Sequence, residues 1–444
     1  MNPQLRRKLD HITDTLWAGG VTNPVTYIEQ ISYLIFLKLL DEEESDRELR
    51  ARLGATGGNA RRLFPDQAER YRWSQWRFKS GNALRDFIRD EVFPYMASLV
   101  KDEPEVAEYF RDAVLEIVDP NVLKQVIDEL DGFEFRKLGP DVKGDIFEYL
   151  LLKQVIDELD GFEFRKLGPD VKGDILVRLG SSSLNGQFRT PRQIRAFMVE
   201  MVDPDFGDAI FDPACGTAGF LTDAVDYLLA KYSDHVSEYP IYGEDWLDKK
   251  GRTVAELKAE SPCLQTYRKG AGEKIPNWEV LEASNHGTDV SRRMVRISMM
   301  NLVLHGIRHA RLNRPNSLPD MGGLSEDDLR RRYQVMLANP PFAGQLPKDS
   351  IRADLPTNSK KSELLFLSLM MLHLAPGGRC AVVVPEGLLF GSTGAHVDLR
   401  KKLINDFDLL AVVSLPAGVF KPYAGVKTAV LVFRRPVSAS AARL

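Results

Sequence analysis

The sequence has little cysteine, and the cysteines it has are scattered. Three cysteines occur in 444 residues, and Cys215, Cys263 and Cys380 form no C-x-x-C pair. This spacing disfavours a disulfide framework and a zinc site, and it fits a reducing compartment. We therefore expect no metal centre.

Long apolar runs are also lacking. The two greasiest stretches, "ISYLIFLKLL" and "LLFLSLMMLHLA", are shorter than the roughly 20 apolar residues that cross a bilayer. The N-terminal stretch "MNPQLRRKLDHITDTLW" is charged and amphipathic, which is unlike a secretory signal peptide. These features predict a cytoplasmic protein with no membrane partner.

Positive charge is not in excess, because 59 Lys and Arg face 63 Asp and Glu, for a formal net charge of −4. Contact with nucleic acid would therefore depend on local basic patches or on a partner that brings the charge. The acidic run Asp41–Glu48 is typical of a solvated helix end.

Two regions with different patterns are present, and a chain of this length is expected to form two or three domains. Residues 1–180 show apolar side chains at helical spacing and no clear strand alternation, as in Ile28, Ile31, Ile35 and Leu39. From about residue 208, short apolar runs alternate with amphipathic stretches, which is typical of an α/β domain with a mostly parallel sheet. We predict an α-helical N-terminal domain at 1–180 and an α/β domain at 181–444.

One segment, "LKQVIDELDGFEFRKLGPDVKGDI", occurs twice without a single difference, at 123–146 and at 152–175. Two copies are too few for a solenoid, and natural repeats drift in sequence. Identity points to a recent duplication or to an error of sequence assembly. Because two identical segments cannot fill one packing position, we expect only one copy to pack natively and assign no function to the other.

A strand, a glycine loop and a helix start are predicted from "AIFDPACGTAGFL", residues 209–221. Gly216 and Gly219 allow a sharp turn and a close approach to a ligand, and Asp212 at the strand tip can accept hydrogen bonds from an ammonium or hydroxyl group. The spacing matches no phosphate-binding loop, and a plain βα turn is the alternative. The candidate cofactor-binding residues here are Asp212, Ala214, Gly216, Thr217 and Gly219.

A second acidic residue is expected at a neighbouring strand end, where folds of this class hold ribose hydroxyls. Asp289 precedes a long amphipathic helix, and Glu244 in "IYGEDW" competes with it for the role. A helix N-cap or a surface carboxylate would explain either residue. We favour Asp289.

The stretch "NGQFRTPRQI" lies just ahead of the α/β domain. Thr190 and Pro191 would make a good helix start, with Thr190 as the N-cap and Pro191 as the first helical residue. Capping does not explain Phe188 and its neighbours Gln187, Arg189 and Arg192, which could line a cofactor or a phosphate. The candidates for cofactor binding in this stretch are Gln187, Phe188, Thr190 and Pro191.

The tetrapeptide Asn339–Phe342 ends a predicted strand in "VMLANPPFAG". Two prolines could simply stop the strand. However, the Asn339 side-chain oxygen and the Pro340 carbonyl could each accept one N–H of an adenine amine, which would free its delocalised lone pair. Phe342 could stack on a flipped-out base, so that positioning does most of the catalytic work. Asn339, Pro340, Pro341 and Phe342 are therefore the catalytic candidates.

Two features flank this tetrapeptide. Pro385, Glu386 and Gly387 end a later strand beside the predicted site, where an ordinary turn would also explain them. A basic group follows the tetrapeptide and is a plausible contact for phosphate: Lys348, Arg352, Lys360 and Lys361.

Together, "DPACGTAGF", "NPPF", "GQFRTPR" and "LWAGGVTNPVTYIEQISYLIFLKLLDE" resemble the methylation subunit of type I restriction-modification systems, a family of adenine-N6 DNA methyltransferases that use S-adenosylmethionine. The resemblance implies an S-adenosylmethionine-dependent, Rossmann-like methyltransferase domain preceded by a helical domain. It implies that the glycine loop and residues 187–192 bind the cofactor, that Asp289 binds the ribose and that Asn339–Phe342 hold the target adenine.

The resemblance also implies partners: double-stranded DNA, a second methylation subunit and one specificity subunit, with or without a restriction motor subunit. Family members often carry a helical tail that docks the specificity subunit, whereas this sequence ends soon after its last predicted strand. An insertion at about 231–284 leaves Glu244 and Asp289 both open as the second acid.

Three other activities fit part of the pattern. A protein-glutamine methyltransferase could use the same tetrapeptide, although the large helical N-terminal region argues against it. A non-catalytic assembly subunit is opposed by the intact tetrapeptide. Cytosine-N4 transfer needs almost the same site, and Phe342 favours adenine only through the resemblance.

Overall fold

The structure is a computed structural model. It describes residues 3–52, 63–101, 103–133, 190–232, 264–266, 274–276, 278–307, 309–313, 330–342, 344–346, 351, 354, 355, 357, 359–420 and 427–437. The chain divides into two compact units, Met1–Arg165 and Lys166–Leu444. The predicted domain boundary at 180 lies outside the described residues, so these limits stay a prediction.

All regular elements described in the first unit are helical, as predicted. They are α1 (Pro3–Ala18), α2 (Pro24–Arg52), η1 (Asp66–Tyr71), α3 (Trp73–Trp76), α4 (Gly81–Phe87), η2 (Ile88–Val92), α5 (Phe93–Ala97), α6 (Pro104–Phe110) and α7 (Pro120–Asp131). Ile28, Ile31 and Ile35 of α2 are fully buried, in agreement with their helical spacing. An aromatic cluster forms the centre of this core around Tyr33, whose ring centroid lies 5.3 Å from that of Phe93.

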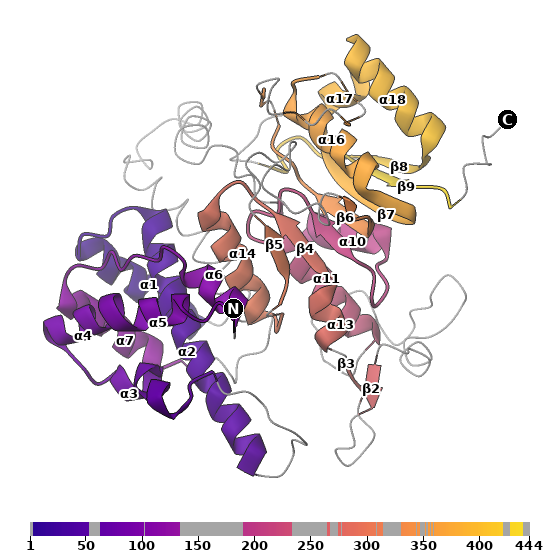
Figure 1. The fold of residues 1–444 in the computed structure, drawn as a ribbon. Helices are drawn as coiled ribbons and strands as arrows, with labels where there is room; N and C mark the ends of the chain where they lie inside the picture. The colour runs from indigo at the N-terminus through magenta and orange to yellow at the C-terminus, as the bar shows by residue number, and fades with distance from the viewer. Residues whose placement is uncertain are drawn as a thin grey trace. The chain divides into compact units, whose positions relative to one another are not determined.

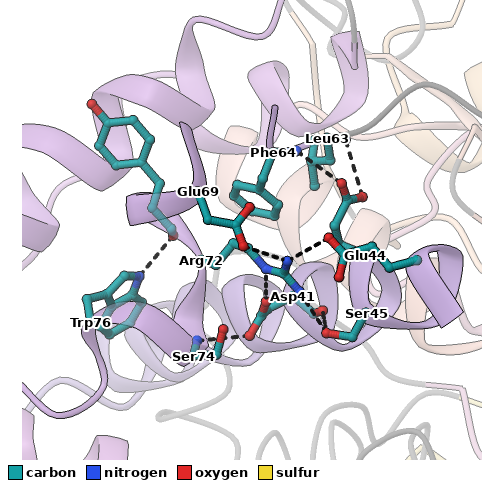
Figure 2. A network of polar contacts seen from close by, with 11 residues as sticks. Asp41, Glu44, Ser45, Leu63, Phe64, Glu69, Arg72, Ser74 and Trp76 are labelled. Atoms are coloured by element: carbon teal, nitrogen blue, oxygen red, sulfur yellow. Dashed lines mark hydrogen bonds and ion pairs between the residues drawn. The ribbon is translucent and has the colours of Figure 1, made fainter. Parts of the chain in front are cut away.

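A buried ionic network joins α2 to the chain that follows it (Figure 2). The Arg72 guanidinium donates to Asp41 at 2.5 Å and to Glu48 and Glu69 at 2.9 Å each. Glu44 accepts hydrogen bonds from two backbone N–H groups, those of Leu63 and Phe64. The prediction that this acidic run is a solvated helix end is therefore wrong for Asp41 and Glu44, which are both buried.

The first copy of the duplicated segment begins inside α7. Its apolar side chains Leu123, Val126, Ile127 and Leu130 are fully buried, and Asp119 caps the helix by accepting a hydrogen bond from Asn121 N at 2.8 Å. The remainder of this copy from residue 134, and the whole second copy, lie outside the described residues. The described part of the first copy packs into the core, as expected for one copy. That the other copy does not pack natively stays a prediction.

A seven-stranded sheet forms the second unit, in the order β5-β4-β1-β6-β7-β9-β8 (Figure 1). The strands are β1 (Ile210–Asp212), β4 (Asn285–Thr288), β5 (Arg311–Asn313), β6 (Tyr333–Ala338), β7 (Leu374–Pro385), β8 (Asp408–Ser414) and β9 (Thr428–Arg434). Strand β9 is antiparallel to both its neighbours, and the other pairs are parallel. The predicted mostly parallel α/β sheet is thus confirmed. The short strands β2 (Leu264–Thr266) and β3 (Lys274–Pro276) pair separately.

Helices cover both faces of the sheet. The helices of this unit are α10 (Arg192–Val202), α11 (Gly219–Tyr232), α13 (Trp278–Ala283), α14 (Arg292–Leu304), α16 (Ser362–His373), α17 (Glu386–Phe390) and α18 (Gly394–Asp406). Alternate residues of β6 point to opposite faces, so Val335 and Leu337 pack with α10, α11 and α14. Met336 and Ala338 pack with α16 and α18.

The strand order reverses at β1, which lies between β4 and β6. Ligands of open α/β sheets bind at the carboxyl ends of the strands at such a point. Across the described parts of both units, no helix combines the length and the apolar character needed to cross a bilayer.

Candidate active site

Three chemically important side chains follow the ends of three adjacent strands. Asp212 is the last residue of β1, Asp289 comes directly after β4, and Asn339 comes directly after β6. The parallel pairing of Asp212 with Gly287 and of Phe211 with Met336 brings all three strand ends to one edge of the sheet. The positions predicted from the sequence are therefore neighbours in space.

The glycine loop between β1 and α11 turns through two residues with positive φ. Gly216 has a φ of +53°, which glycine adopts without strain, and Ala218 has a φ of +62°. For a residue with a β-carbon this conformation costs about 1 kcal/mol. Such local strain gathers at binding and catalytic sites. Nothing in the sequence pattern marks Ala218 for this role.

Side chains of α14 fix the carbonyl groups of this loop. Ser298 Oγ donates to Gly216 O at 2.5 Å, and Asn301 Nδ2 donates to Thr217 O at 2.8 Å. Because hydrogen bonds from α14 fix these carbonyls, the loop is preorganised. Ser298 and Asn301 were missed in the sequence, where their one signal is a pair of polar residues three positions apart on an otherwise apolar helix face.

Two carboxyl groups share this edge. Burial raises the pKa of Asp212 to about 8, against the hydrogen bond it accepts from Ala214 N at 3.0 Å, and nearby Asp289 raises it further. Burial also raises the pKa of Asp289 to about 6, against the N–H groups of Ser291 at 2.8 Å and Gly216 at 3.2 Å. A ligand that brings positive charge or hydroxyl donors would relieve the repulsion between the two carboxylates.

The N-cap alternative for Asp289 is wrong. Helix α14 begins at Arg292 with Ser291 as its N-cap, whose side chain accepts a hydrogen bond from Met294 N. Because the Asp289 carboxylate instead accepts from Gly216 N, it links the end of β4 to the glycine loop. Glu244, the competing acid, lies outside the described residues.

A buried ion pair backs the loop from the side of α10. Arg195 Nε donates to Asp223 at 2.8 Å, and Arg195 Nη1 donates to the Thr190 carbonyl at 2.9 Å. Helix α10 begins at Arg192 with Pro191 at the N-cap position and no side-chain cap, so the predicted capping role of Thr190 is wrong. Thr190 itself is buried, and the hydrogen bond from Arg195 to its carbonyl links it to the neighbourhood of the glycine loop. Gln187 and Phe188 lie outside the described residues.

The side-chain amide of Asn339 is buried without hydrogen-bond partners. Neither its Oδ1 nor its Nδ2 has a hydrogen-bond partner among the described residues, although both atoms are shielded from solvent. Buried amides in native proteins are nearly always paired, so an orphaned one points to a missing ligand. Phe342 is half-buried, with its ring edge-on to that of Phe420 at 6.4 Å.

The tetrapeptide is held by the first residue of α16. Ser362 Oγ donates to the Pro341 carbonyl at 3.0 Å and accepts from Gly344 N at 2.9 Å. Ser362 is itself buried, so this bridge is shielded from competing water. The sequence gives no local signal for this role, because 20 intervening positions separate the two residues.

Among the described residues of both units, no group of three or more His, Cys, Asp or Glu side chains is suited to hold a metal ion. Cys215 and Cys380 are buried thiols whose pKa values burial raises well above the ordinary value. A thiolate nucleophile or metal ligand is therefore disfavoured at both positions.

This chain is similar to several known proteins. The N-6 DNA methylase family model matches residues 178–257 and 271–442, and the HsdM N-terminal domain model matches residues 5–130. The methylase subunit of the type I restriction enzyme EcoEI from Escherichia coli is 30% identical over 94% of this chain and 72% of its own length. The EcoKI methylase subunit from Escherichia coli K12 is 26% identical over 98% of this chain and 68% of its own length.

A solved structure agrees with these relatives. A chain from a study of complex assembly and conformational transition in the type I restriction-modification system superposes with a TM-score of 0.65 and 27% identity, over 98% of this chain and 74% of that one. The family models, the curated relatives and the shared fold all lead to one assignment. The chain belongs to the N-6 DNA methylase family and is a type I restriction-modification methylation subunit, an adenine-specific DNA methyltransferase.

Proposed function

We propose that the methyl donor is S-adenosylmethionine, bound by the glycine loop and the two carboxyl groups at the ends of β1 and β4. Asp212 and Asp289 suit its ammonium and ribose hydroxyl groups, and the turn at Gly216 admits a ligand close to the backbone. The sulfonium of this cofactor supplies an activated methyl group. Ala214, Thr217 and Gly219 complete the loop, and Gln187, Phe188, Thr190 and Pro191 are proposed to close over the methionine end.

The target adenine is proposed to bind at Asn339–Phe342 after it leaves the duplex. The Asn339 amide carries this assignment, because its two buried polar atoms have no partner among the described residues. The Oδ1 atom and the Pro340 carbonyl would accept the two N–H bonds of the adenine amine, which directs the nitrogen lone pair toward the methyl group. Ser362 holds Pro341 at 3.0 Å and thereby limits movement of this loop.

The partners are proposed to be duplex DNA, one specificity subunit and a second methylation subunit, with a restriction motor subunit where the system also cleaves. The net charge of −4 supports a division of labour in which another subunit provides much of the DNA contact. The cytoplasm, where the host chromosome lies, is the proposed compartment, and the domain limits 1–180 and 181–444 are proposed with it.

Long-read modified-base sequencing of a host that carries either the parent gene or Asn339→Ala tests the proposal. We expect N6-methyladenine at one sequence motif with the parent and none with the variant. Loss of N4-methylcytosine instead would support the same active site but identify cytosine as the target base. Unchanged modification would refute the role of Asn339 and favour a non-catalytic assembly subunit.

A further inference from the structure

Phe390 is an exposed aromatic residue on the α17 turn that follows β7. Its side chain is 77% exposed, whereas Leu388, two residues earlier, is 1% exposed and anchors the same turn in the core. An exposed phenylalanine costs apolar hydration in the isolated chain. A rigidly presented one therefore points to a contact made in a complex.

The backbone around Phe390 is fixed from α18. Arg400 donates from Nη1 to the Leu388 carbonyl and from Nη2 to the Gly391 carbonyl, both at 2.8 Å. Gly391 N also donates to the Gly387 carbonyl at 2.9 Å. These bonds flank Phe390 on both sides, so the ring is presented by a rigid turn.

This turn lies at the same sheet edge as the tetrapeptide. Strands β6 and β7 run parallel, with Ala338 opposite Val382, and β7 ends at Pro385 directly before α17. Both Asn339 and α17 therefore follow the carboxyl ends of adjacent strands. In Figure 1, α17 lies beside α16 and α18.

Side-chain contacts also connect the two loops through α16. Ser362 binds the Pro341 carbonyl, and its neighbours Lys361 and Glu363 act electrostatically on His396 of α18. His396 in turn packs against Gly391, where an added β-carbon would come within 2.6 Å of its ring. Burial lowers the pKa of His396, and the charge of Lys361 lowers it further. The side chain is therefore neutral near pH 7 and serves as packing.

The charge of this edge suits a nucleic acid. Lys360 and Lys361 are exposed just ahead of α16, at the end of the loop that follows the tetrapeptide. Such lysines can contact phosphates of a duplex that also meets an aromatic side chain. Duplex DNA is the substrate of the family to which the chain belongs, and it is the occupant that this combination fits.

We propose that Phe390 is a DNA-contacting residue that stacks on a base beside the target adenine and stabilises the gap left when that adenine leaves the helix. An apolar ring that enters the base stack offsets part of the cost of unstacking, as aromatic wedges do in other DNA complexes. The inference rests on the proposed placement of the target adenine at Asn339–Phe342.

The test uses this chain in complex with its specificity subunit and a duplex that carries the motif found by sequencing. Base flipping is followed by fluorescence of 2-aminopurine at the target position, and methylation is timed on a paired target and on a target opposite an abasic site. Asn339→Ala is measured beside Phe390→Ala, so that failure of the proposed active site is seen separately.

We expect Phe390→Ala to slow methylation of the paired duplex by about tenfold to a hundredfold and to remove most of the fluorescence rise, since one base stack is lost. The abasic duplex, in which the target is already unpaired, should restore the rate to within about threefold of the parent. Phe390→Trp should retain the parent's behaviour. Phe78→Ala, at a phenylalanine that is 73% exposed in the first unit, is the matched control and should change neither reading.

Three outcomes would overturn the inference. Parent-like flipping and rate in Phe390→Ala would show that the ring has no role. An equal loss on both duplexes would place the defect outside base flipping. Loss of the specificity subunit from the Phe390→Ala complex on size-exclusion chromatography would assign the ring to a protein contact.

Discussion

Arg195 lies against Gly219 so closely that a β-carbon on the glycine would come within 2.9 Å of Arg195 Nε. The guanidinium has little room to retreat, because Asp223 holds it at 2.8 Å and the Thr190 carbonyl at 2.9 Å. The first residue of α11 therefore needs to be glycine for packing as well as for any ligand.

Gly219→Ala is expected to destabilise the chain by about 1–3 kcal/mol, because the new methyl group must displace a buried ion pair. Chemical unfolding measures this directly. Gly394→Ala is the control, since a β-carbon there meets nothing within 4 Å and its free energy of unfolding should stay within about 0.5 kcal/mol of the parent. Equal stability of all three proteins would show that Arg195 yields easily.

Ser362→Ala should reduce kcat for methylation by about tenfold while cofactor affinity stays the same, because it frees the loop that is proposed to position the adenine. Ser362→Thr keeps the hydroxyl and should recover much of the rate. Ser368→Ala in the same helix is the matched control: its hydroxyl is buried with no hydrogen-bond partner among the described residues, so its loss should be neutral or stabilising. A fall in cofactor affinity with Ser362→Ala would mean that the bridge serves the glycine loop instead.

Asn339→Leu should abolish methylation and yet raise the free energy of unfolding by about 1 kcal/mol or more, because it replaces an unsatisfied buried amide by an apolar group of similar volume. The contrasting variant is Asn285→Leu. Asn285 Oδ1 is also buried without a partner among the described residues, but Nδ2 donates to Leu281 O at 2.7 Å, so Asn285→Leu leaves that carbonyl without its donor and should destabilise. If Asn339→Leu were the less stable of the two, the amide would have structural partners of its own.

The sequence predicts the part of this site that follows local rules. Strand ends are visible as apolar runs that stop at Asp212 and Asn339, and a turn that needs positive φ is visible as Gly216. Parallel strands then bring their ends to one edge, so a correct reading of the strands also places these residues near one another.

The sequence does not predict contacts made from distant helices. Ser298, Ser362 and Arg195 act on the loops through side-chain positions that only packing determines. The expectation for Thr190 failed because Pro191 takes the N-cap position, which a Thr-Pro pair does not distinguish from a start one residue earlier. The acidic run in α2 was misjudged because its partner Arg72 lies 31 positions beyond Asp41.

Arg72→Ala should destabilise the first unit by about 3–5 kcal/mol, because it leaves the buried Asp41 carboxylate without its cation. Trp73 and Trp76 lie next in the chain and are buried, so tryptophan fluorescence should follow unfolding of this unit. Arg89→Ala is the control, since its pairs with Asp86 and Asp90 are exposed and its unfolding midpoint should barely move. A parent-like midpoint for Arg72→Ala would mean that water replaces the guanidinium.

Asp212→Asn should flatten the dependence of stability on pH in the protein without cofactor. Burial and Asp289 raise the pKa of Asp212 to about 8 from an ordinary 3.8, so the folded chain holds this proton more tightly than the unfolded chain. The contribution of Asp212 is therefore fully present below the unfolded pKa and is lost as the pH rises through about 8. The asparagine has no proton to lose, so the variant should gain on the parent steadily across this window.

Thermal midpoints of both proteins at a series of pH values from weakly acid to alkaline measure the difference. Asp398→Asn, at an exposed position on α18, should run parallel to the parent. A constant gap between Asp212→Asn and the parent would show that Asp212 is ionised throughout, and the carboxyl pair would then repel in the ligand-free protein wherever Asp289 is also ionised, above its pKa of about 6. A gap that widens with pH would show instead that Asp212 holds a proton in the ligand-free protein, which is the behaviour expected of a buried carboxyl group proposed to accept hydrogen bonds from the donor's ammonium or ribose groups.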